Sequence, residues 1–307
     1  MITVVGEALV DLIERPPGTV VAHPGGSPAN VAVALGRLGR PTSLLTQVGT
    51  DPYGRLLIEH FRDNGVRLAP GSLLDCPVTN VARTSLSPDG QAEYTFDVAW
   101  RAFAPPPVRQ VEANSTCLHV GSIAAVLEPG SVSIDALINT ASRTATISYD
   151  PNCRPSLMGN PARVRHRVEG LVAVSDIVKV SLDDLAWLYP GQQHSEVAKA
   201  WLDLGARLVV ITLGADGAWG YTRHRATRID AVAVDVIDTV GAGDAFMAGL
   251  IYACGEANLL GTHKRAELAA VDDAVLVDIL QFASRIAAVT CGRRGADPPT
   301  LAELVPR

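Results

Sequence analysis

The sequence has 307 residues, enough for one large α/β domain or two smaller ones. Hydrophobic residues make up 48% of it and charged residues 19%, a composition typical of a folded globular protein and not of a disordered one. The formal net charge of −6 and the lack of any run of Lys or Arg exclude a broad nucleic-acid-binding surface. They do not exclude a local basic pocket for a small anion.

Cysteine and histidine usage argues against a metal centre or a disulfide framework. The five cysteines include no Cys-x-x-Cys pair, and the seven histidines show no metal-binding spacing. We expect reduced thiols in a cytoplasmic protein. Glu7 and Asp11 interrupt the first apolar run, so we expect no signal peptide, and we expect no segment that spans a bilayer. Neither a membrane nor a nucleic acid is an expected partner.

The chain begins with a predicted strand at 2–5 that continues outward to Asp11. In open α/β sheets ligands collect beyond the carboxyl ends of strands, so Asp11 is a candidate for holding substrate hydroxyls. A surface turn would explain the same residue equally well. Strands and helices then alternate, with a strand predicted at 42–48 and a helix from Pro52 to about Asn64. This βαβα order predicts a parallel sheet covered on both faces.

A glycine pair precedes the first predicted helix. Ser27 is a predicted N-cap and Pro28 a suitable first helical residue. That assignment leaves Gly25, Gly26 and Asn30 unexplained. The Asn30 side chain, in the first helical turn, could face a polyol.

The alternation breaks at two β-rich runs, 78–86 and 91–98, which Ser87-Pro88-Asp89-Gly90 joins as a hairpin signal. We expect a small separate sheet here, with a further strand around 16–21. Tyr94, Phe96 and Arg101 lie on or after this hairpin, where packing and ligand contact are both open to them.

Further strands are predicted at 116–120, 145–149, 176–180 and 208–213, with a helix at 131–141. The strand at 145–149 leads into a polar cluster of Asp150, Asn152 and Arg154. A Pro-punctuated turn explains Asn152 but leaves Arg154 without a role. Lys179 lies near the end of the next strand, and Ser181 is a predicted cap for the helix that contains Asp184.

The rest of the chain is organised around Asp238–Gly249. A predicted strand at 229–237 leads into Gly241-Ala242-Gly243-Asp244, and a helix follows at 245–254. Strand, glycine turn and helix start together aim backbone N–H groups at one point, which suits a bulky anion. A carboxylate at this point repels an anion unless it has another task, such as accepting a proton from an attacking hydroxyl. The alternative is a carboxylate that only complements the helix dipole.

After this helix, 255–278 is expected to be a mobile surface connection before a helix at 280–290.

Two common phosphate-binding motifs do not fit this sequence. The sequence contains no Gly-x-x-x-x-Gly-Lys-Ser/Thr, so a P-loop NTPase is excluded. The turn at 241–246 lacks the third glycine of a dinucleotide fingerprint and lies late in the chain, so a nicotinamide dehydrogenase is a weak alternative.

The sequence resembles the ribokinase-like (PfkB-type) family of carbohydrate kinases along nearly its whole length. Residues 25–39, beginning Gly-Gly-Ser-Pro-Ala-Asn-Val-Ala, resemble the N-terminal signature of that family, and 238–246 resemble its C-terminal signature. The segments 6–12 and 294–299 are most similar to the fructokinase and 2-keto-3-deoxygluconate kinase branch. The resemblance implies one domain over 1–307, a three-layer α/β/α sandwich with a mainly parallel central sheet. It also implies a β-sheet lid built from about 12–23 and 77–103, through which members of the family often dimerise.

The resemblance also implies a role for each candidate residue in ATP-dependent phosphorylation of a primary sugar hydroxyl. Asp244 is the implied general base, and the amides of Gly241, Ala242 and Gly243 belong to the implied anion hole for the transferring phosphoryl group. The implied sugar-side residues are Asp11, Gly25, Gly26, Asn30, Tyr94, Phe96, Arg101 and Arg154. The implied ATP-side residues are Lys179, Ser181, Thr212, Gly214 and Gly217. Asp184 is implied to organise Mg²⁺ through water, and Asp238 with the Val240 carbonyl to bind K⁺ beside the loop near Ala288 and Arg293.

Several substrates and one different class of function remain open at this stage. Fructose is the first expectation, 2-keto-3-deoxygluconate the second and a ribose-containing nucleoside the third. An acidic substrate needs more positive charge at the lid than Arg101 provides, which favours a neutral sugar. The different class is a catalytically silent regulator that binds a sugar or nucleotide on the same fold. The intact Asp244 and glycine pair argue against that regulator.

Overall fold

The computed structural model describes residues 1–15, 19–75, 78–86, 92–103 and 115–304. In these ranges a nine-stranded sheet runs in the order β13-β12-β11-β10-β9-β8-β1-β4-β5. All its neighbouring pairs are parallel except β11/β12 and β12/β13, which are antiparallel. Its strands are β1 (Ile2–Val5), β4 (Thr42–Leu45), β5 (Val66–Leu68), β8 (Cys117–Gly121), β9 (Thr146–Asp150), β10 (Ile177–Ser181), β11 (Leu208–Thr212), β12 (Ala218–Tyr221) and β13 (Ala226–Ile229).

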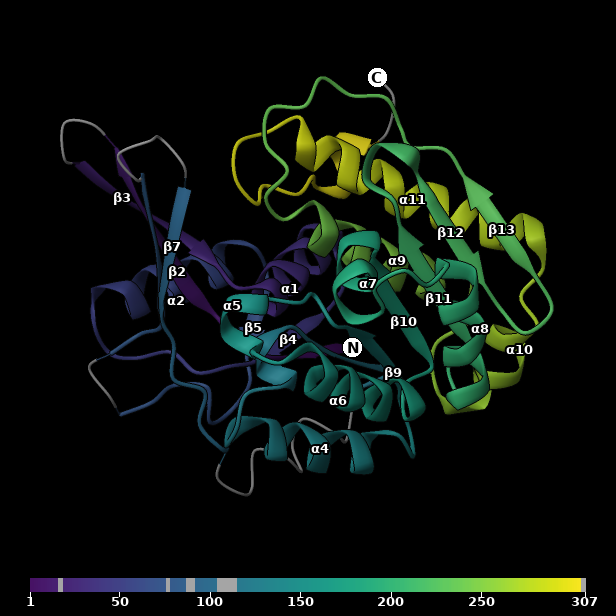
Figure 1. The fold of residues 1–307 in the computed structure, drawn as a ribbon. Helices are drawn as coiled ribbons and strands as arrows, with labels where there is room; N and C mark the ends of the chain where they lie inside the picture. The colour runs from purple at the N-terminus through teal and green to yellow at the C-terminus, as the bar shows by residue number, and fades with distance from the viewer. Residues whose placement is uncertain (16–18, 76–77, 87–91, 104–114, 305–307) are drawn as a thin grey trace.

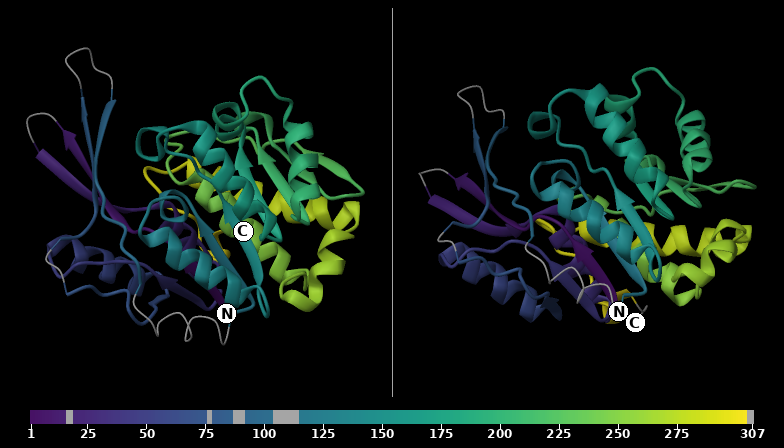
Figure 2. Two further views of the ribbon diagram at one scale, coloured as in Figure 1. Left: turned by 60° about the horizontal axis from the view of Figure 1, so that its bottom comes forward. Right: turned by 90° about the horizontal axis from the view of Figure 1, so that it is seen from below.

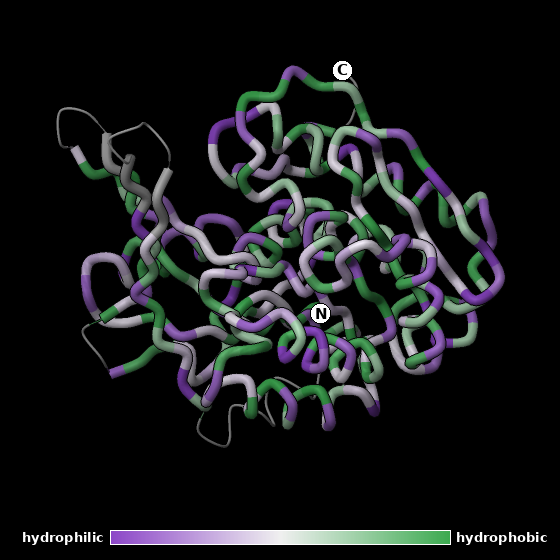
Figure 3. The backbone as a smooth tube through the Cα atoms, in the orientation of Figure 1, coloured by the Kyte–Doolittle hydropathy of each residue, from purple (hydrophilic) through white to green (hydrophobic). Residues whose placement is uncertain are grey.

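Helices cover both faces of this sheet, because its central strands are apolar on both sides. Successive residues of β1 show this: Val4 belongs to one hydrophobic core and Val5 to the other, and neither is exposed. The first core takes α1 (Ser27–Arg37), α2 (Pro52–Asp63), α9 (Ala242–Glu256), α10 (Arg265–Ala269) and α11 (Asp273–Cys291). The second takes α4 (Gly130–Ala141), α6 (Pro161–Ala173), α7 (Leu182–Leu188) and α8 (His194–Leu204), and the short α5 (Pro155–Met158) precedes α6. Hydrophilic residues are concentrated on the outer helices and turns (Figure 3). The structure confirms the expected layered α/β/α architecture.

A second, four-stranded sheet projects from one end of the molecule (Figures 1 and 2). Its order is β3-β2-β6-β7, formed by β2 (Leu9–Arg15), β3 (Thr19–Gly25), β6 (Val81–Leu86) and β7 (Ala92–Asp97). The β6/β7 pair is antiparallel, as the hairpin pattern predicts, although the turn at 87–91 lies outside the described residues. The chain thus enters the small sheet directly from β1 and returns from it to α1.

The strand predicted at 229–237 is wrong beyond its first residue. β13 ends at Ile229, and the chain then crosses the surface as an irregular segment (Figure 1). Val232, Val234 and Val236 recur at every second position, with Ala233 and Asp235 between them, and this β-branched alternation is typical of a strand. They are 43%, 39% and 62% exposed, and no neighbouring strand pairs with this segment in the described part of the chain. The glycine turn is therefore entered from a loop and not from a strand.

The mobile connection predicted at 255–278 is also wrong. This segment contains α10 and the first turns of α11, which begins at Asp273 after the N-cap Asp272. The Asp272 side chain accepts a hydrogen bond from the Val275 amide at 2.9 Å, and Leu276 packs into the core.

α11 is apolar and long enough to cross a membrane by composition and length, contrary to the expectation that no segment could span a bilayer. It packs along α9 in the first core, as a core helix of a soluble protein does.

Asp51 joins the start of α2 to the segment that enters the small sheet. Its carboxylate accepts hydrogen bonds from Gly54 N at 2.7 Å, Thr79 N at 2.9 Å and Thr79 Oγ1 at 2.6 Å. Burial raises its pKa, but the hydrogen bonds from Thr79 and Gly54 outweigh burial and hold the pKa below the usual value.

We expect Asp51→Ala to lower the free energy of unfolding by about 1–2 kcal/mol, as loss of an N-cap does. Because the folded pKa is depressed, this contribution is present above the unfolded pKa of about 4 and disappears as pH falls through the folded value. Urea unfolding of both proteins at pH 7 and in acid measures the difference. A constant gap between the two at every pH would contradict the assignment.

Candidate active site

The glycine turn places Asp244 in the first turn of α9. Gly241 is the N-cap and adopts a left-handed conformation with φ of +75°. A Cβ at this position would lie 2.5 Å from the Ala296 Cβ, so only glycine fits. A Cβ on Gly243 would lie 3.3 Å from Lys179 Nζ, so this ammonium sits directly against the turn. Backbone amides and a buried cation thus face the same point, which suits an anion.

The Asp244 carboxylate is 6% exposed and is held by donors from two distant parts of the chain. Ser27 Oγ donates to Oδ1 at 2.7 Å and Asn30 Nδ2 donates to Oδ2 at 2.8 Å, both from α1. Asn152 Nδ2, which follows β9, donates to Oδ1 at 3.3 Å. The turn of α9, the start of α1 and the end of β9 therefore meet at one carboxylate.

The predicted N-cap at Ser27 is wrong. Gly26 is the N-cap of α1, with no side-chain cap hydrogen bond, and Ser27 is already helical. The Ser27 hydroxyl donates to the Asp244 carboxylate instead and does not cap the helix. Gly26 has φ of +100°, and a Cβ there would lie 2.6 Å from the Glu7 carbonyl oxygen. The glycine pair thus lets α1 start directly against the end of β1.

Two opposing effects act on the pKa of Asp244. Burial raises it, while hydrogen bonds from Asn30 and Ser27 and the charge of Lys179 lower it, and the net result is a raised pKa. A carboxylate that is buried, ionised and surrounded by donors is a fixed proton acceptor. A raised pKa increases its basicity toward a hydroxyl.

Lys179 and Asp150 form a buried ion pair below this carboxylate. Lys179 Nζ lies 2.7 Å from Asp150 Oδ2, and their side chains are only 4% and 1% exposed. They lie on adjacent parallel strands, β10 and β9. Burial lowers the pKa of Lys179, but the charge and hydrogen bond of Asp150, with the charges of Asp184 and Asp244, outweigh it and raise the pKa. Lys179 is therefore a permanent cation at the turn.

Asp184 and Ser181 form a capping box at the start of α7, as predicted for Ser181. The two Asp184 oxygens accept from Cys153 N at 2.8 Å and Ser181 N at 3.4 Å. Burial is the main cause of its raised pKa. Asp184 thus ties the segment after β9 to the end of β10, and a metal ion in this region would meet its oxygens already engaged by backbone amides.

Asp11 and Arg154 lie on the side of the small sheet. Asp11, in β2, packs so closely on Gly25 that a Cβ there would lie 2.2 Å from Asp11 Oδ2. Burial raises the pKa of Asp11 to about 6, with Arg154 lowering it and Asp244 raising it. Arg154 Nη1 donates to Asn152 Oδ1 at 2.7 Å, so it orients the amide that reaches Asp244.

Asp238 connects the glycine turn to the C-terminal loop. Its Oδ1 accepts from Val240 N at 3.1 Å and its Oδ2 accepts from Gly295 N at 2.8 Å. In the described ranges, no group of three or more His, Cys, Asp and Glu side chains could hold a metal ion.

The sequence model described as pfkB family carbohydrate kinase matches residues 1–303. The chain belongs to the pfkB family of carbohydrate kinases. A fructokinase of Rhizobium leguminosarum bv. trifolii is 36% identical over 275 residues, which cover 87% of this chain and 84% of the relative. The aminoimidazole riboside kinase of Salmonella typhimurium is 32% identical over 305 residues, covering 95% and 89%.

Solved structures of the family show the same fold. Fructokinase from Xylella fastidiosa with bound ATP has a TM-score of 0.89 at 26% identity, covering 98% of this chain and 96% of that one. A fructokinase double mutant from Vibrio cholerae, in a fructose, ADP and potassium ion bound form, has a TM-score of 0.76 at 30% identity, covering 96% and 93%. The ribokinase-like fold is confirmed, and the chain is an ATP-dependent carbohydrate kinase, not a silent regulator.

The remaining candidate residues of this kinase lie around the central cluster. Thr212 ends β11 and pairs in register with Ser181. Gly214 and Gly217 form the following turn with φ of +58° and +88°, and a Cβ on Gly214 would meet open space. Gly214 thus leaves room for a ligand beside the end of β11, whereas a Cβ on Gly217 would lie 2.1 Å from the Ile229 carbonyl oxygen.

The other three candidate residues, Tyr94, Phe96 and Arg101, lie on the small sheet or on the segment that leaves it. Phe96 is half-buried in β7 opposite Ala82, and the Tyr94 side chain lies outside the described part of the chain. Gln47 fixes the Arg101 backbone on both sides, accepting from Arg101 N at 3.0 Å and donating to Arg101 O at 2.5 Å. These residues lie on the small sheet and its exit, whereas Asp244 lies in the first turn of α9.

The sequence analysis did not assign Ser27 or Glu7 to the candidate site, and it named Asp150 only as a member of a polar cluster, without a role. The signal for Asp150 was Lys179 itself, because a lysine inside an apolar strand requires a buried acid nearby. Glu7 is 2% exposed, accepts from Ala124 N at 3.1 Å and has a pKa raised to about 7 by burial. Nothing in the sequence distinguishes Glu7 from a surface acid.

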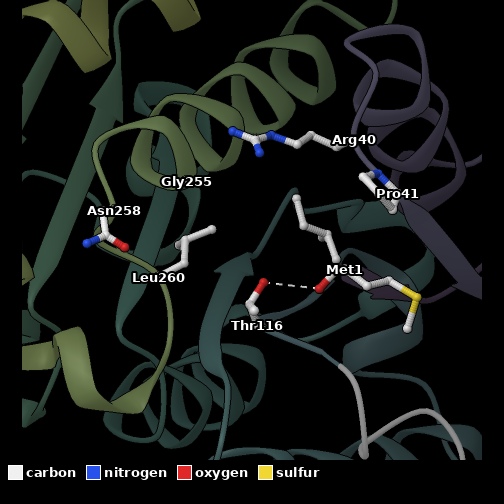
Figure 4. Close-up of a pocket in the computed structure, with 8 residues that line it drawn as sticks. Met1, Arg40, Pro41, Thr116, Gly255, Asn258 and Leu260 are labelled. Carbon is white, nitrogen blue, oxygen red and sulfur yellow. Dashed lines mark hydrogen bonds between the residues drawn. The ribbon is translucent and has the colours of Figure 1, made fainter.

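A small pocket of about 170 Å³ lies at the opposite edge of the sheet. It lies beside Met1 and Thr116, which precede β1 and β8, so it opens at the amino ends of the parallel strands (Figure 4). Arg40, Asn258 and Leu260 complete its wall, and the Thr116 hydroxyl donates to the Met1 carbonyl at 3.1 Å. It contains none of the predicted site residues, and ligands of open α/β sheets bind at the other edge.

Proposed function

We propose that this kinase transfers the γ-phosphate of ATP to a primary hydroxyl of fructose, with Asp244 as the general base. The observation that carries the proposal is the Asp244 carboxylate itself. It is buried and ringed by donors, yet it lies within the turn whose amides and lysine favour an anion. A negative carboxylate beside a positively charged anion-binding turn suits a reaction in which a base deprotonates a hydroxyl next to a phosphoryl group.

Fructose is supported by the relatives. The Rhizobium relative is named a fructokinase, and the Vibrio structure holds fructose, ADP and a potassium ion. In our proposal Asp11, Asn30 and Arg154 hold the sugar, while Gly25 lets Asp11 approach closely and Gly26 lets α1 start against the end of β1. The small sheet serves as the lid that excludes water, Phe96 and Arg101 face the sugar from it, and a sugar contact of Tyr94 stays a prediction.

The nucleotide lies along the turns after β10, β11 and the glycine turn in this proposal. Gly214 leaves open space for it, while Gly241 lets Ala296 pack against the turn and Gly243 lets Lys179 approach it. Lys179 and the amides of 241–244 stabilise the charge that develops on the transferring phosphoryl group. When bound, Mg²⁺ neutralises phosphate charge, and Asp184 orders the segment beside it. K⁺ binds near Asp238 and the Val240 carbonyl. Thr212, Gly217 and Ser181 face the nucleotide from the strand ends.

A ribose-containing nucleoside is a second candidate substrate, because an aminoimidazole riboside kinase is 32% identical over 95% of this chain. 2-Keto-3-deoxygluconate is the remaining candidate substrate. An ADP-release assay with MgATP and KCl across ketoses, aldoses, ketodeoxy acids and nucleosides separates them. We expect fructose to give the highest kcat/KM. A higher value for a nucleoside or a ketodeoxy acid would contradict fructose and leave the kinase chemistry intact.

Localisation and assembly complete the proposal. A cytoplasmic location suits the free cysteines at 117, 153, 254 and 291. Dimerisation through the small sheet remains a prediction, which light scattering of the purified protein measures directly. A monomer at all accessible concentrations would contradict it.

Ser27→Ala tests the role of the donors around the base. The base must be ionised to act, so activity is lost as pH falls through the pKa of Asp244. Loss of the Ser27 hydrogen bond destabilises the ionised form and raises that pKa further. We expect kcat/KM in acid to fall about tenfold, the low end for a hydrogen bond to a charged group, with a smaller change at high pH.

The pH profile of Ser27→Ala needs a matched serine control, which separates loss of the hydrogen bond to Asp244 from the general effect of removing a buried hydroxyl. Ser175 is 2% exposed and donates to the Leu171 carbonyl at 2.7 Å, away from the site. Ser175→Ala should keep the acid limb of the wild type. An unshifted acid limb in Ser27→Ala would show that Asp244 does not set this limb.

A further inference from the structure

Asp297 is held between two arginines in the C-terminal loop. Arg37, the last residue of α1, pairs with its carboxylate through Nη1, which also donates to the Pro298 carbonyl at 2.6 Å. Arg293 Nη1 lies 3.4 Å from Asp297 Oδ2 on the other side. We call Arg37, Asp297 and Arg293 the clamp. It fastens a loop that has neither helix nor strand between Cys291 and Leu301.

The same loop supports the glycine turn from behind. A Cβ on Gly241 would lie 2.9 Å from the Ala296 Cα and 2.5 Å from its Cβ, so Ala296 packs directly on the turn. Gly295 N donates to Asp238 Oδ2 at 2.8 Å, just before the turn. The loop therefore contacts the turn through 295–296 and the clamp through the next residue, Asp297.

α1 is a firm anchor for this arrangement. Eight of its residues are buried, including Val31 and Leu35, and it packs against α9 and β1. The loop has fewer buried residues than α1, with Pro298 and Pro299 buried and the Asp297 side chain 44% exposed. The clamp thus adds a link from α1 to the part of the loop that packs on Gly241.

We propose that the clamp is a positioning device for the anion-binding turn at 241–244, acting on the nucleotide and not on the sugar. The inference rests on the proposed function, in which these amides face the phosphates of ATP. Preorganised amides lose much of their effect when displaced by about 1 Å. The sugar-side residues Asn30 and Asp11 belong to α1 and β2, which do not depend on the loop.

A second ion pair of the same kind provides the control. Arg40, three residues beyond Arg37, pairs with Glu256 at the far end of α9, with side chains 27% and 59% exposed. Both pairs join the end of α1 to the C-terminal part of the chain and are partly exposed, so each contributes little to stability. Only the clamp reaches the glycine turn.

The experiment compares Asp297→Ala with Glu256→Ala in the full chain. We expect Asp297→Ala to raise the Kd for ADP, measured by calorimetry, roughly three- to thirtyfold, as for residues that act through an intervening element. kcat/KM for ATP should fall by a similar factor, while the Kd for fructose stays unchanged. Glu256→Ala should change none of these values. Arg37→Ala combined with Asp297→Ala should be less than additive, because both remove the same link.

Equal ADP affinities in Asp297→Ala and Glu256→Ala would overturn the inference, and so would a matching loss of fructose affinity. If Asp297→Ala does not fold, Asp297→Asn keeps the side-chain shape and removes the charge. Unchanged ADP binding in that variant would likewise overturn it. Failure of the proposed function would look different, because the wild type would then release no ADP with any sugar while its ADP affinity could still be compared with that of the variants.

Discussion

Asp244→Asn should lower turnover at least about a hundredfold, the low end for removal of a general base, while fructose still binds. The amide has nearly the shape of the carboxylate but cannot take up the hydroxyl proton. Ser27 and Asn152 can still donate to the remaining oxygen, and Asn30 must rotate its amide so that its oxygen accepts from the new Nδ2. Turnover is measured by ADP release at saturating ATP and fructose, and fructose binding by calorimetry.

Two controls make the Asp244→Asn result interpretable. An unchanged melting temperature excludes a folding defect, and an unchanged Kd for fructose excludes a collapsed sugar pocket. Turnover within about threefold of the wild type would remove Asp244 from the role of base, since base catalysis contributes roughly a hundredfold or more.

Lys179→Ala should destabilise the protein by about 3–5 kcal/mol, because it leaves the Asp150 carboxylate buried without its partner. Asp150 is 1% exposed, and its other described contact is the Asn152 amide at 3.2 Å. Urea unfolding at pH 7 measures the loss. Activity should fall as well, because the cation beside Gly243 is removed.

A double substitution separates the two effects of Lys179. Lys179→Met with Asp150→Asn removes both charges, so it should recover much of the lost stability without recovering activity. Lys264→Ala breaks the exposed pair with Glu267 and should cost at most about 1 kcal/mol. A cost for Lys179→Ala as small as that of Lys264→Ala would show that the buried pair is not a structural element.

Much of the fold was predictable because its strands are short apolar runs bounded by turn residues. β1 matches its predicted range, and the β6/β7 hairpin and the start of α2 at Pro52 follow the pattern closely. The failures occurred where local pattern and tertiary context disagree. Val232, Val234 and Val236 alternate as in a strand but find no partner strand, and the start of α11 was obscured by its acidic first turn.

The sequence could nominate candidate residues for the site, but not the network that joins them. Asp244, Asn30 and Arg154 could be selected because each stands beside a turn at a strand or helix end. Their connection through Asn152 could not, since it depends on how β9 and α9 meet in space. Ser27 was misassigned for the same reason, because a serine before proline fits a cap locally and only the packed structure brings it to Asp244.

The most direct test of phosphoryl transfer to the sugar is the ³¹P NMR spectrum of a reaction containing the kinase, MgATP, KCl and fructose. We predict ADP and a sugar phosphate in equal amounts, with the phosphoryl group on a primary carbon. ADP accompanied only by inorganic phosphate, or ATP left intact with every sugar tested, would contradict the account.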